Sequence, residues 1–71
     1  MTYRDAFGKI LKRLREERGL SQSKLASMAG LSHTFIGQLE RGDRCPTIDT
    51  VFMLAKVLEV KAAKIIEEIE K

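Results

Sequence analysis

A chain of 71 residues has room for one domain, and its core is only marginally large enough for stability. The hydrophobic content of 44% is ordinary for a folded protein and argues against disorder. A single cysteine excludes an internal disulfide and fits a reducing cytoplasm. No apolar run is long enough to cross a bilayer or to serve as a signal peptide. We therefore expect a cytoplasmic protein with no membrane partner.

The net charge of +3 favours a polyanionic partner only weakly, and its distribution is more informative. Residues 1–24 carry seven Lys or Arg against three Asp or Glu, whereas the rest of the chain is close to neutral. This basic excess is equally consistent with a solvated helix face and with a polyanion-binding surface.

The first predicted element is a helix over about 3–18. Its apolar residues recur at the spacing of one helical face: Phe7, Ile10, Leu11 and Leu14. Gly19 supplies the left-handed residue that ends the helix. The alternating pattern of a strand occurs nowhere, so the sequence predicts an all-α fold.

Two short helices joined by a tight turn are predicted over about 21–42. Ser21 and Ser32 are good N-caps for the two helices, and Gly30 permits the sharp turn between them. The two helices must cross closely, which requires a small residue at Ala26. The remaining apolar positions that fix such a crossing are also present in order: Leu31, Ile36 and Leu39.

Two further helices are predicted over about 47–70. Thr47 caps the first, whose inward stripe is expected to contain Ile48, Val51, Leu54, Ala55 and Leu58. The last segment has isoleucines at helical spacing, but Lys61 stands where a polar cap is usual. We expect a helix there that frays at its end unless something packs on it.

The exposed face of the second helix of the 21–42 pair has the chemistry of a DNA base reader. Gln38 can pair with adenine, Thr34 can contact a thymine methyl, and His33 can donate to guanine or to phosphate. Gly37 leaves a gap through which the floor of the major groove could approach. A short exposed helix with polar residues at its N-terminus fits that groove.

The run Q-x-x-L-A-x-x-A-G-x-S-x-x-x-I-x-x-L-E-R-G, followed by R-x-P and L-A-K-x-L-x-V, resembles the Cro and phage-repressor (XRE-like) helix-turn-helix family. The resemblance covers roughly residues 5–69. It implies a compact, five-helix, lambda-repressor-like DNA-binding domain over 1–71, with the helix-turn-helix at about 21–42. It also implies a homodimer on double-stranded DNA.

The resemblance also assigns roles by position. The base-contacting positions are those of His33, Thr34 and Gln38, with Gly37 between them. Phosphate contacts are expected from Gln22, Lys24, Ser32, Arg41 and Arg44, of which Lys24 departs from the acidic residue common in the family. Arg15 and Glu40 match a buried ion pair that joins the first helix to the third.

A self-association surface is expected at the C-terminal end. Phe52 lies beside the main apolar stripe of its helix, and Ile65, Ile66 and Ile69 follow at helical spacing. These four residues are candidates for a dimer interface. Complete burial within the monomer accounts nearly as well for Ile65 and Ile69.

No catalytic or metal-binding constellation is present in the sequence, so we expect neither an enzyme nor a cofactor. The predicted function is a transcriptional regulator that binds operator DNA as a homodimer, of the phage-repressor or restriction–modification controller type. The alternative is a protein-interaction module, such as the antitoxin of a toxin–antitoxin pair or a coactivator that bridges other factors. A protein partner such as a toxin or polymerase therefore stays open.

Overall fold

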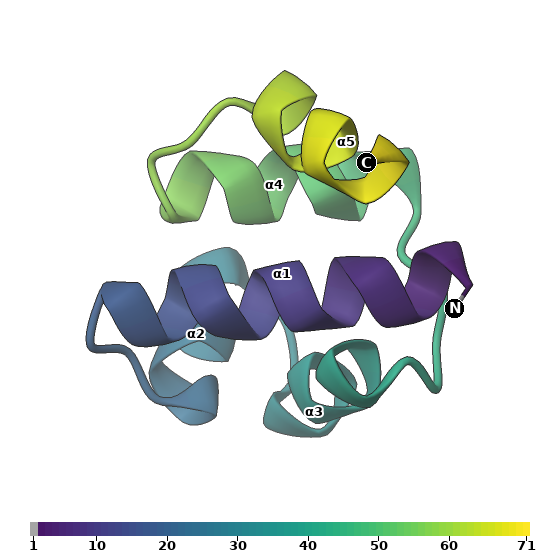
Figure 1. Cartoon of the computed structure of the whole chain (residues 1–71). Coiled ribbons are helices and arrows are strands. Elements are labelled where there is room, and N and C mark those ends of the chain that lie inside the picture. The colour runs from purple at the N-terminus through teal and green to yellow at the C-terminus, as the bar shows by residue number, and fades with distance from the viewer. Residues whose placement is uncertain (1) are drawn as a thin grey trace.

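A computed structural model describes residues 2–71 and contains five helices in that range. They are α1 (Tyr3–Glu17), α2 (Gln22–Ala29), α3 (His33–Arg41), α4 (Ile48–Val57) and α5 (Ala62–Glu70). The longest helix, α1, runs through the middle, with α2 and α3 on one side and α4 and α5 on the other (Figure 1). The predicted all-α, five-helix architecture is confirmed.

Local capping chemistry sets where the helices begin. The hydroxyls of Ser21, Ser32 and Thr47 each accept a hydrogen bond from the backbone N–H three residues later, as predicted for N-caps. Thr2 and Asp5 form a reciprocal capping box that starts α1, which the sequence analysis did not identify. Lys61 makes no such bond, yet α5 forms from Ala62 because its apolar face packs on the core.

The core lies where α1 meets the two flanking helix pairs. Its largest fully buried side chains come from all five helices and from the residue that caps α4: Phe7, Leu11, Leu25, Ile36, Leu39, Leu54, Leu58 and Ile65. The prediction of Ile65 as an interface residue is therefore wrong, because 2% of it is exposed and a partner cannot reach it. Ile48 was expected in the inward stripe of α4, but 61% of it is exposed because it lies in the first turn, at the rim of the core.

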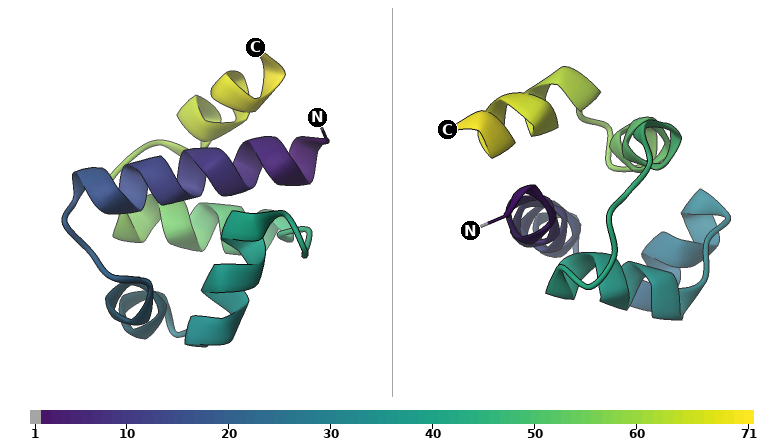
Figure 2. Two further views of the ribbon diagram at one scale, coloured as in Figure 1. Left: turned by 60° about the horizontal axis from the view of Figure 1, so that its bottom comes forward. Right: turned by 90° about the vertical axis from the view of Figure 1, so that its right-hand side faces the viewer.

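The closest approach between helices is that of α1 to α3. A β-carbon placed on Gly8 would lie 2.5 Å from the carbonyl oxygen of Leu39 and 2.6 Å from that of Glu40. Only glycine therefore fits at this position of α1. The crossing brings the C-terminal half of α3 against the middle of α1, and the views in Figure 2 show the two helices crossing steeply.

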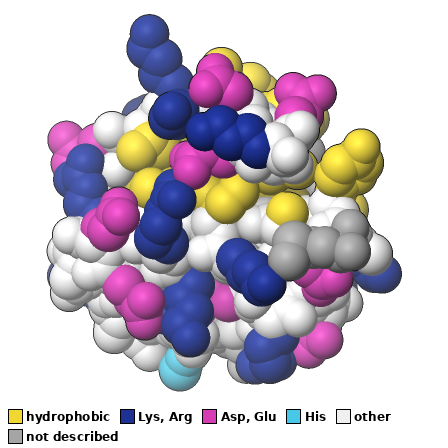
Figure 3. All heavy atoms as spheres, viewed as in Figure 1, with side chains coloured by type: hydrophobic (Ala, Val, Ile, Leu, Met, Phe, Trp, Pro, Cys, Tyr) yellow, Lys and Arg dark blue, Asp and Glu magenta, His cyan; other side chains and the backbone are white. Residues whose placement is uncertain are grey.

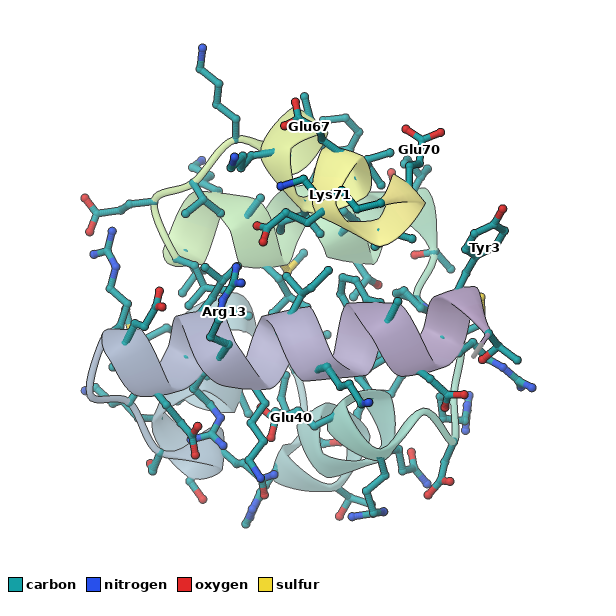
Figure 4. All side chains as sticks on the ribbon, viewed as in Figure 1. Tyr3, Arg13, Glu40, Glu67, Glu70 and Lys71 are labelled. Carbon is teal, nitrogen blue, oxygen red and sulfur yellow. The ribbon has the colours of Figure 1, made fainter. Side chains whose placement is uncertain are left out.

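The helices α1 and α5 are joined by an ion pair as well as by apolar packing. The Arg13 guanidinium donates to both carboxylate oxygens of Glu68, at 2.8 and 2.9 Å. These hydrogen bonds lower the pKa of Glu68. Figure 4 shows the Arg13 side chain rising from α1 toward the layer of α4 and α5. Across the described residues, no helix is both long and apolar enough to span a membrane.

Candidate nucleic-acid interface

The α2–turn–α3 unit presents the N-terminal turn of α3 to solvent. Gly30 ends α2 in the left-handed conformation, with φ of 70°, so the chain reverses into α3 within three residues. The side chains of His33 and Thr34 are exposed, and Gln38 is half-buried one turn later. The structure thus brings these three predicted base-contacting residues onto one accessible stretch of α3.

A buried ion pair anchors this unit to α1. The Arg15 guanidinium donates to Glu40 through Nε at 2.6 Å and Nη2 at 3.1 Å, and its Nη1 donates to the carbonyl of Leu20 at 2.7 Å. These bonds to Glu40 raise the pKa of Arg15. The two side chains are only 10% and 4% exposed, and Glu40 lies between α1 and α3 (Figure 4). The expected pair of Arg15 and Glu40 is therefore present and ties α3 to α1.

The same carboxylate orients Gln22 at the start of α2. Its amide nitrogen donates to Glu40 Oε1 at 3.0 Å, so the amide oxygen points the other way. That oxygen lies 3.0 Å from Nε2 of His33. Because an amide oxygen only accepts, Nε2 of His33 must carry a proton and donate to it.

The second ring nitrogen of His33 is also engaged by α2. Its Nδ1 lies 3.2 Å from the hydroxyl of Ser23, which donates to it when the imidazole is neutral. Both ring nitrogens of His33 therefore join α3 to α2 in the free protein. The sequence analysis expected a base contact from His33 and did not identify Ser23, because neither spacing nor composition reveals this hydrogen bond.

The gap expected at Gly37 is occupied. Gly37 is buried, and a β-carbon there would lie 3.2 Å from Nη1 of Arg41. Side chains on a helix point back toward its N-terminus, so Arg41 covers the position four residues before it. A shallow hollow of about 190 Å³ remains beside it, lined by Gln22, His33, Thr34, Gly37 and Arg41. In the free protein, the space left by the missing side chain of Gly37 is thus taken up by the end of Arg41.

The other predicted phosphate-contacting residues, Lys24, Ser32 and Arg44, do not line this hollow. Lys24 is exposed in the first turn of α2. The hydroxyl of Ser32 accepts from the N–H of Phe35 at 3.0 Å, so that oxygen is used as the cap of α3. Arg44 is exposed in the loop after α3, and its guanidinium carbon lies 5.9 Å from the centre of the Phe35 ring.

The basic excess of the N-terminal residues does not form a continuous patch on the face seen in Figure 3. Lys and Arg side chains on this face alternate with Asp and Glu, as expected for a solvated helix surface (Figure 3). Within the hollow itself, the basic side chain is that of Arg41.

A separate apolar surface lies between α4 and α5. Ile48 and Phe52 are 61% and 59% exposed, and Ile66 is 36% exposed. They line a groove of about 500 Å³ whose other walls are Ala62, Ala63, Glu67 and Glu70. Ile69, predicted at an interface, is half-buried against the core.

Comparison with known proteins assigns the family. The sequence pattern of the helix-turn-helix family HTH_3 matches residues 11–65. The chain belongs to this helix-turn-helix family. The match contains the whole α2–turn–α3 unit together with α4, so it covers the residues that form the hollow.

Individual relatives agree with the family match. An uncharacterized HTH-type transcriptional regulator of Sinorhizobium fredii, y4dJ, is 36% identical over 66 residues, which are 93% of this chain and 86% of that protein. The restriction–modification controller C.AhdI from Aeromonas hydrophila has a TM-score of 0.84 at 34% identity, covering 87% of this chain and 94% of the other. The biofilm regulator SinR, solved in complex with DNA, has a TM-score of 0.80 at 30% identity, covering 84% and 97%. The chain spans only 28% and 35% of two longer curated relatives.

Proposed function

We propose that this protein is a sequence-specific transcriptional regulator that binds operator DNA as a homodimer, with α3 of each subunit in the major groove. One observation carries the proposal: Glu40, Gln22 and His33 lock α3 to α2 and α1 while Thr34 and Gln38 stay accessible on α3. A rigid helix with accessible polar side chains is what direct readout of base edges requires. The family, and the DNA complex of its member SinR, support the same assignment.

Phosphate contacts are proposed around the edge of this surface. Gln22 and Lys24 begin α2, where the positive end of the helix dipole favours an anion, and Ser32 begins α3 in the same way. Arg44 is exposed in the loop after α3. Such contacts place the protein on the duplex without reading its sequence.

The homodimer is proposed to form through the groove between α4 and α5. Phe52 and Ile48 are large apolar side chains that a monomer leaves in water, and the groove that they line has a volume of about 500 Å³. Pairing on a two-fold axis would present two copies of α3, as recognition of two half-sites about 34 Å apart, or one turn of DNA, requires.

Phe52→Asp is predicted to prevent this pairing, because it places a charge in the centre of the apolar groove. Sedimentation equilibrium should then give the mass of a monomer, whereas the wild type gives that of a dimer. Met53→Asp is the matched control. Met53 is also exposed in α4, at 43%, but it does not line the groove. Loss of the dimer in both variants, or in neither, would contradict this interface.

Gln38→Ala is predicted to relax base recognition without unfolding the protein. Loss of a good bidentate contact costs about 1–3 kcal/mol of discrimination at one base pair. Fluorescence anisotropy at fixed salt, on an enriched duplex and on a random one, should show a loss confined to the enriched duplex. Lys24→Ala provides the contrast. Loss of a phosphate contact should lower the affinity for both duplexes, and it should reduce the slope of log affinity against log salt concentration by about one.

The alternative interaction module makes the opposite prediction. If Gln38→Ala kept full affinity and full preference for the enriched duplex, the proposed reading surface would be wrong. Circular dichroism of the variant establishes that its helices are intact, so that a loss of binding is attributable to the side chain.

A further inference from the structure

The Arg41 side chain lies on the accessible face of α3, within the same hollow as the predicted base-contacting residues. Its Nη1 atom is placed so that a β-carbon on Gly37 would be 3.2 Å away, and Gln22, His33 and Thr34 line the same hollow. Arg44, on the loop after α3, does not line this hollow, and its guanidinium carbon lies 5.9 Å from the centre of the Phe35 ring. Arg41 therefore shares this hollow with two of the predicted base-contacting residues, His33 and Thr34.

Asp43 holds this guanidinium at its inner end. Nε of Arg41 donates to Oδ2 of Asp43 at 3.0 Å. Neither Nη1 nor Nη2 makes a hydrogen bond to any of the residues that the structure describes. The carboxylate thus orients the guanidinium through one side edge and leaves both terminal nitrogens with unused N–H groups.

Two parallel N–H donors at the end of this guanidinium match one base edge in the major groove. Guanine presents the acceptors O6 and N7 there, and a bidentate arginine is the commonest specific contact to it. Adenine presents an amino donor beside N7, so it would meet one of the two N–H groups with another donor. Cytosine and thymine offer no pair of adjacent acceptors.

We infer that Arg41 is a specificity-determining residue that reads a guanine in each half-site, with Asp43 as its positioning residue. This inference rests on the proposed function and extends it to the base that is read. Gly37 has a defined part in it, because its missing side chain leaves the room in which the guanidinium lies. The resemblance to the family had instead implied a phosphate contact for Arg41.

Selection from a random duplex pool tests the inference directly, with wild type and Arg41→Ala compared at the same stated salt concentration. The wild type should enrich a guanine in each half-site that Arg41→Ala no longer enriches. Replacing that guanine by 7-deazaguanine removes the N7 acceptor. Wild-type affinity should then fall roughly ten-fold or more, while the affinity of Arg41→Ala stays unchanged. Arg41 is exposed, so circular dichroism should show the variant folded.

Asp43→Asn distinguishes the effect of Asp43 on the orientation of the Arg41 guanidinium from the effect of its negative charge on DNA affinity. Removing a negative charge near DNA should leave affinity for random duplex the same or higher, yet the preference for guanine over other bases should fall several-fold because the guanidinium is held less firmly. Arg44→Ala is the matched control for a lost arginine. Arg44→Ala should lower the affinity for every duplex by a similar factor, and selection with this variant should still enrich the same sequence as the wild type.

Arg41→Ala that enriched the wild-type sequence and lost affinity equally on all duplexes would overturn the inference and make Arg41 a phosphate contact. The proposed function would survive that outcome. A wild type that enriched no sequence at all would instead overturn the proposed function and the inference together.

Discussion

Gly8→Ala will destabilise the protein by about 2–3 kcal/mol, although alanine is the better helix former. The added β-carbon would lie 2.5 and 2.6 Å from the backbone carbonyl oxygens of Leu39 and Glu40, so α1 and α3 must move apart. Overpacking of a well-packed site typically costs about 1–3 kcal/mol. The cost falls at the upper end here because backbone atoms cannot rotate away, and it exceeds the gain of up to about 1 kcal/mol in helix propensity.

The same substitution at Gly37 is the matched control and should have the opposite sign. Its β-carbon would meet only the end of the flexible Arg41 side chain, at 3.2 Å. Gly37→Ala should therefore gain up to about 1 kcal/mol from helix propensity. Urea denaturation of both variants measures the two free energies of unfolding. If the two substitutions changed the free energy of unfolding equally, or if Gly8→Ala were as stable as the wild type, α1 and α3 would not be in close backbone contact at Gly8.

Glu40→Ala will have the second large effect, a loss of about 3–5 kcal/mol, because it leaves the Arg15 guanidinium buried without its carboxylate. Since small domains have only about 5–15 kcal/mol of stability in total, the variant should be close to unfolding. Arg13→Ala provides the comparison. It removes the half-exposed ion pair between Arg13 of α1 and Glu68 of α5, so the free energy of unfolding should fall by no more than about 1 kcal/mol.

A double replacement distinguishes two contributions to the loss of stability: the cost of burying an unpaired charge, and the net contribution of the ion pair to the free energy of unfolding. Arg15→Met with Glu40→Leu should recover most of the stability, because apolar side chains of similar volume often replace a buried pair at little cost. Its DNA recognition should nevertheless fall, because Gln22 loses the carboxylate that orients its amide toward His33. Thermal unfolding and DNA binding of the same variants measure the two effects separately. A double variant no more stable than Glu40→Ala would contradict this explanation.

Those features of the fold that depend on local sequence were predictable. Apolar spacing and the polar caps Ser21, Ser32 and Thr47 located the helices to within a residue or two, and the glycine after α2 located the turn. The buried pair of Arg15 and Glu40 followed from the resemblance to a family. Each of these signals is carried by residues near one another in sequence or by a known motif.

The remaining features depend on contacts between distant segments, which the sequence does not display. Gly8 looks like an ordinary helical glycine until α3 is placed against it. Ile65 and Ile66 are two isoleucines at consecutive positions, yet the first is buried in the core and the second is exposed. In the candidate site, helical spacing allows Arg41 to cover Gly37, but the hydrogen bond that Arg41 makes to Asp43 depends on the conformation of the turn after α3, which spacing does not encode.

Selection of bound duplexes from a random DNA pool, at a stated salt concentration, tests the central claim most directly. A dimer that places two copies of α3 in successive major grooves should enrich a palindrome whose half-sites are about 34 Å apart, or one helical turn. Recovery of only random sequence, or of a sequence without two-fold symmetry, would contradict the account of this protein as a homodimeric operator-binding regulator.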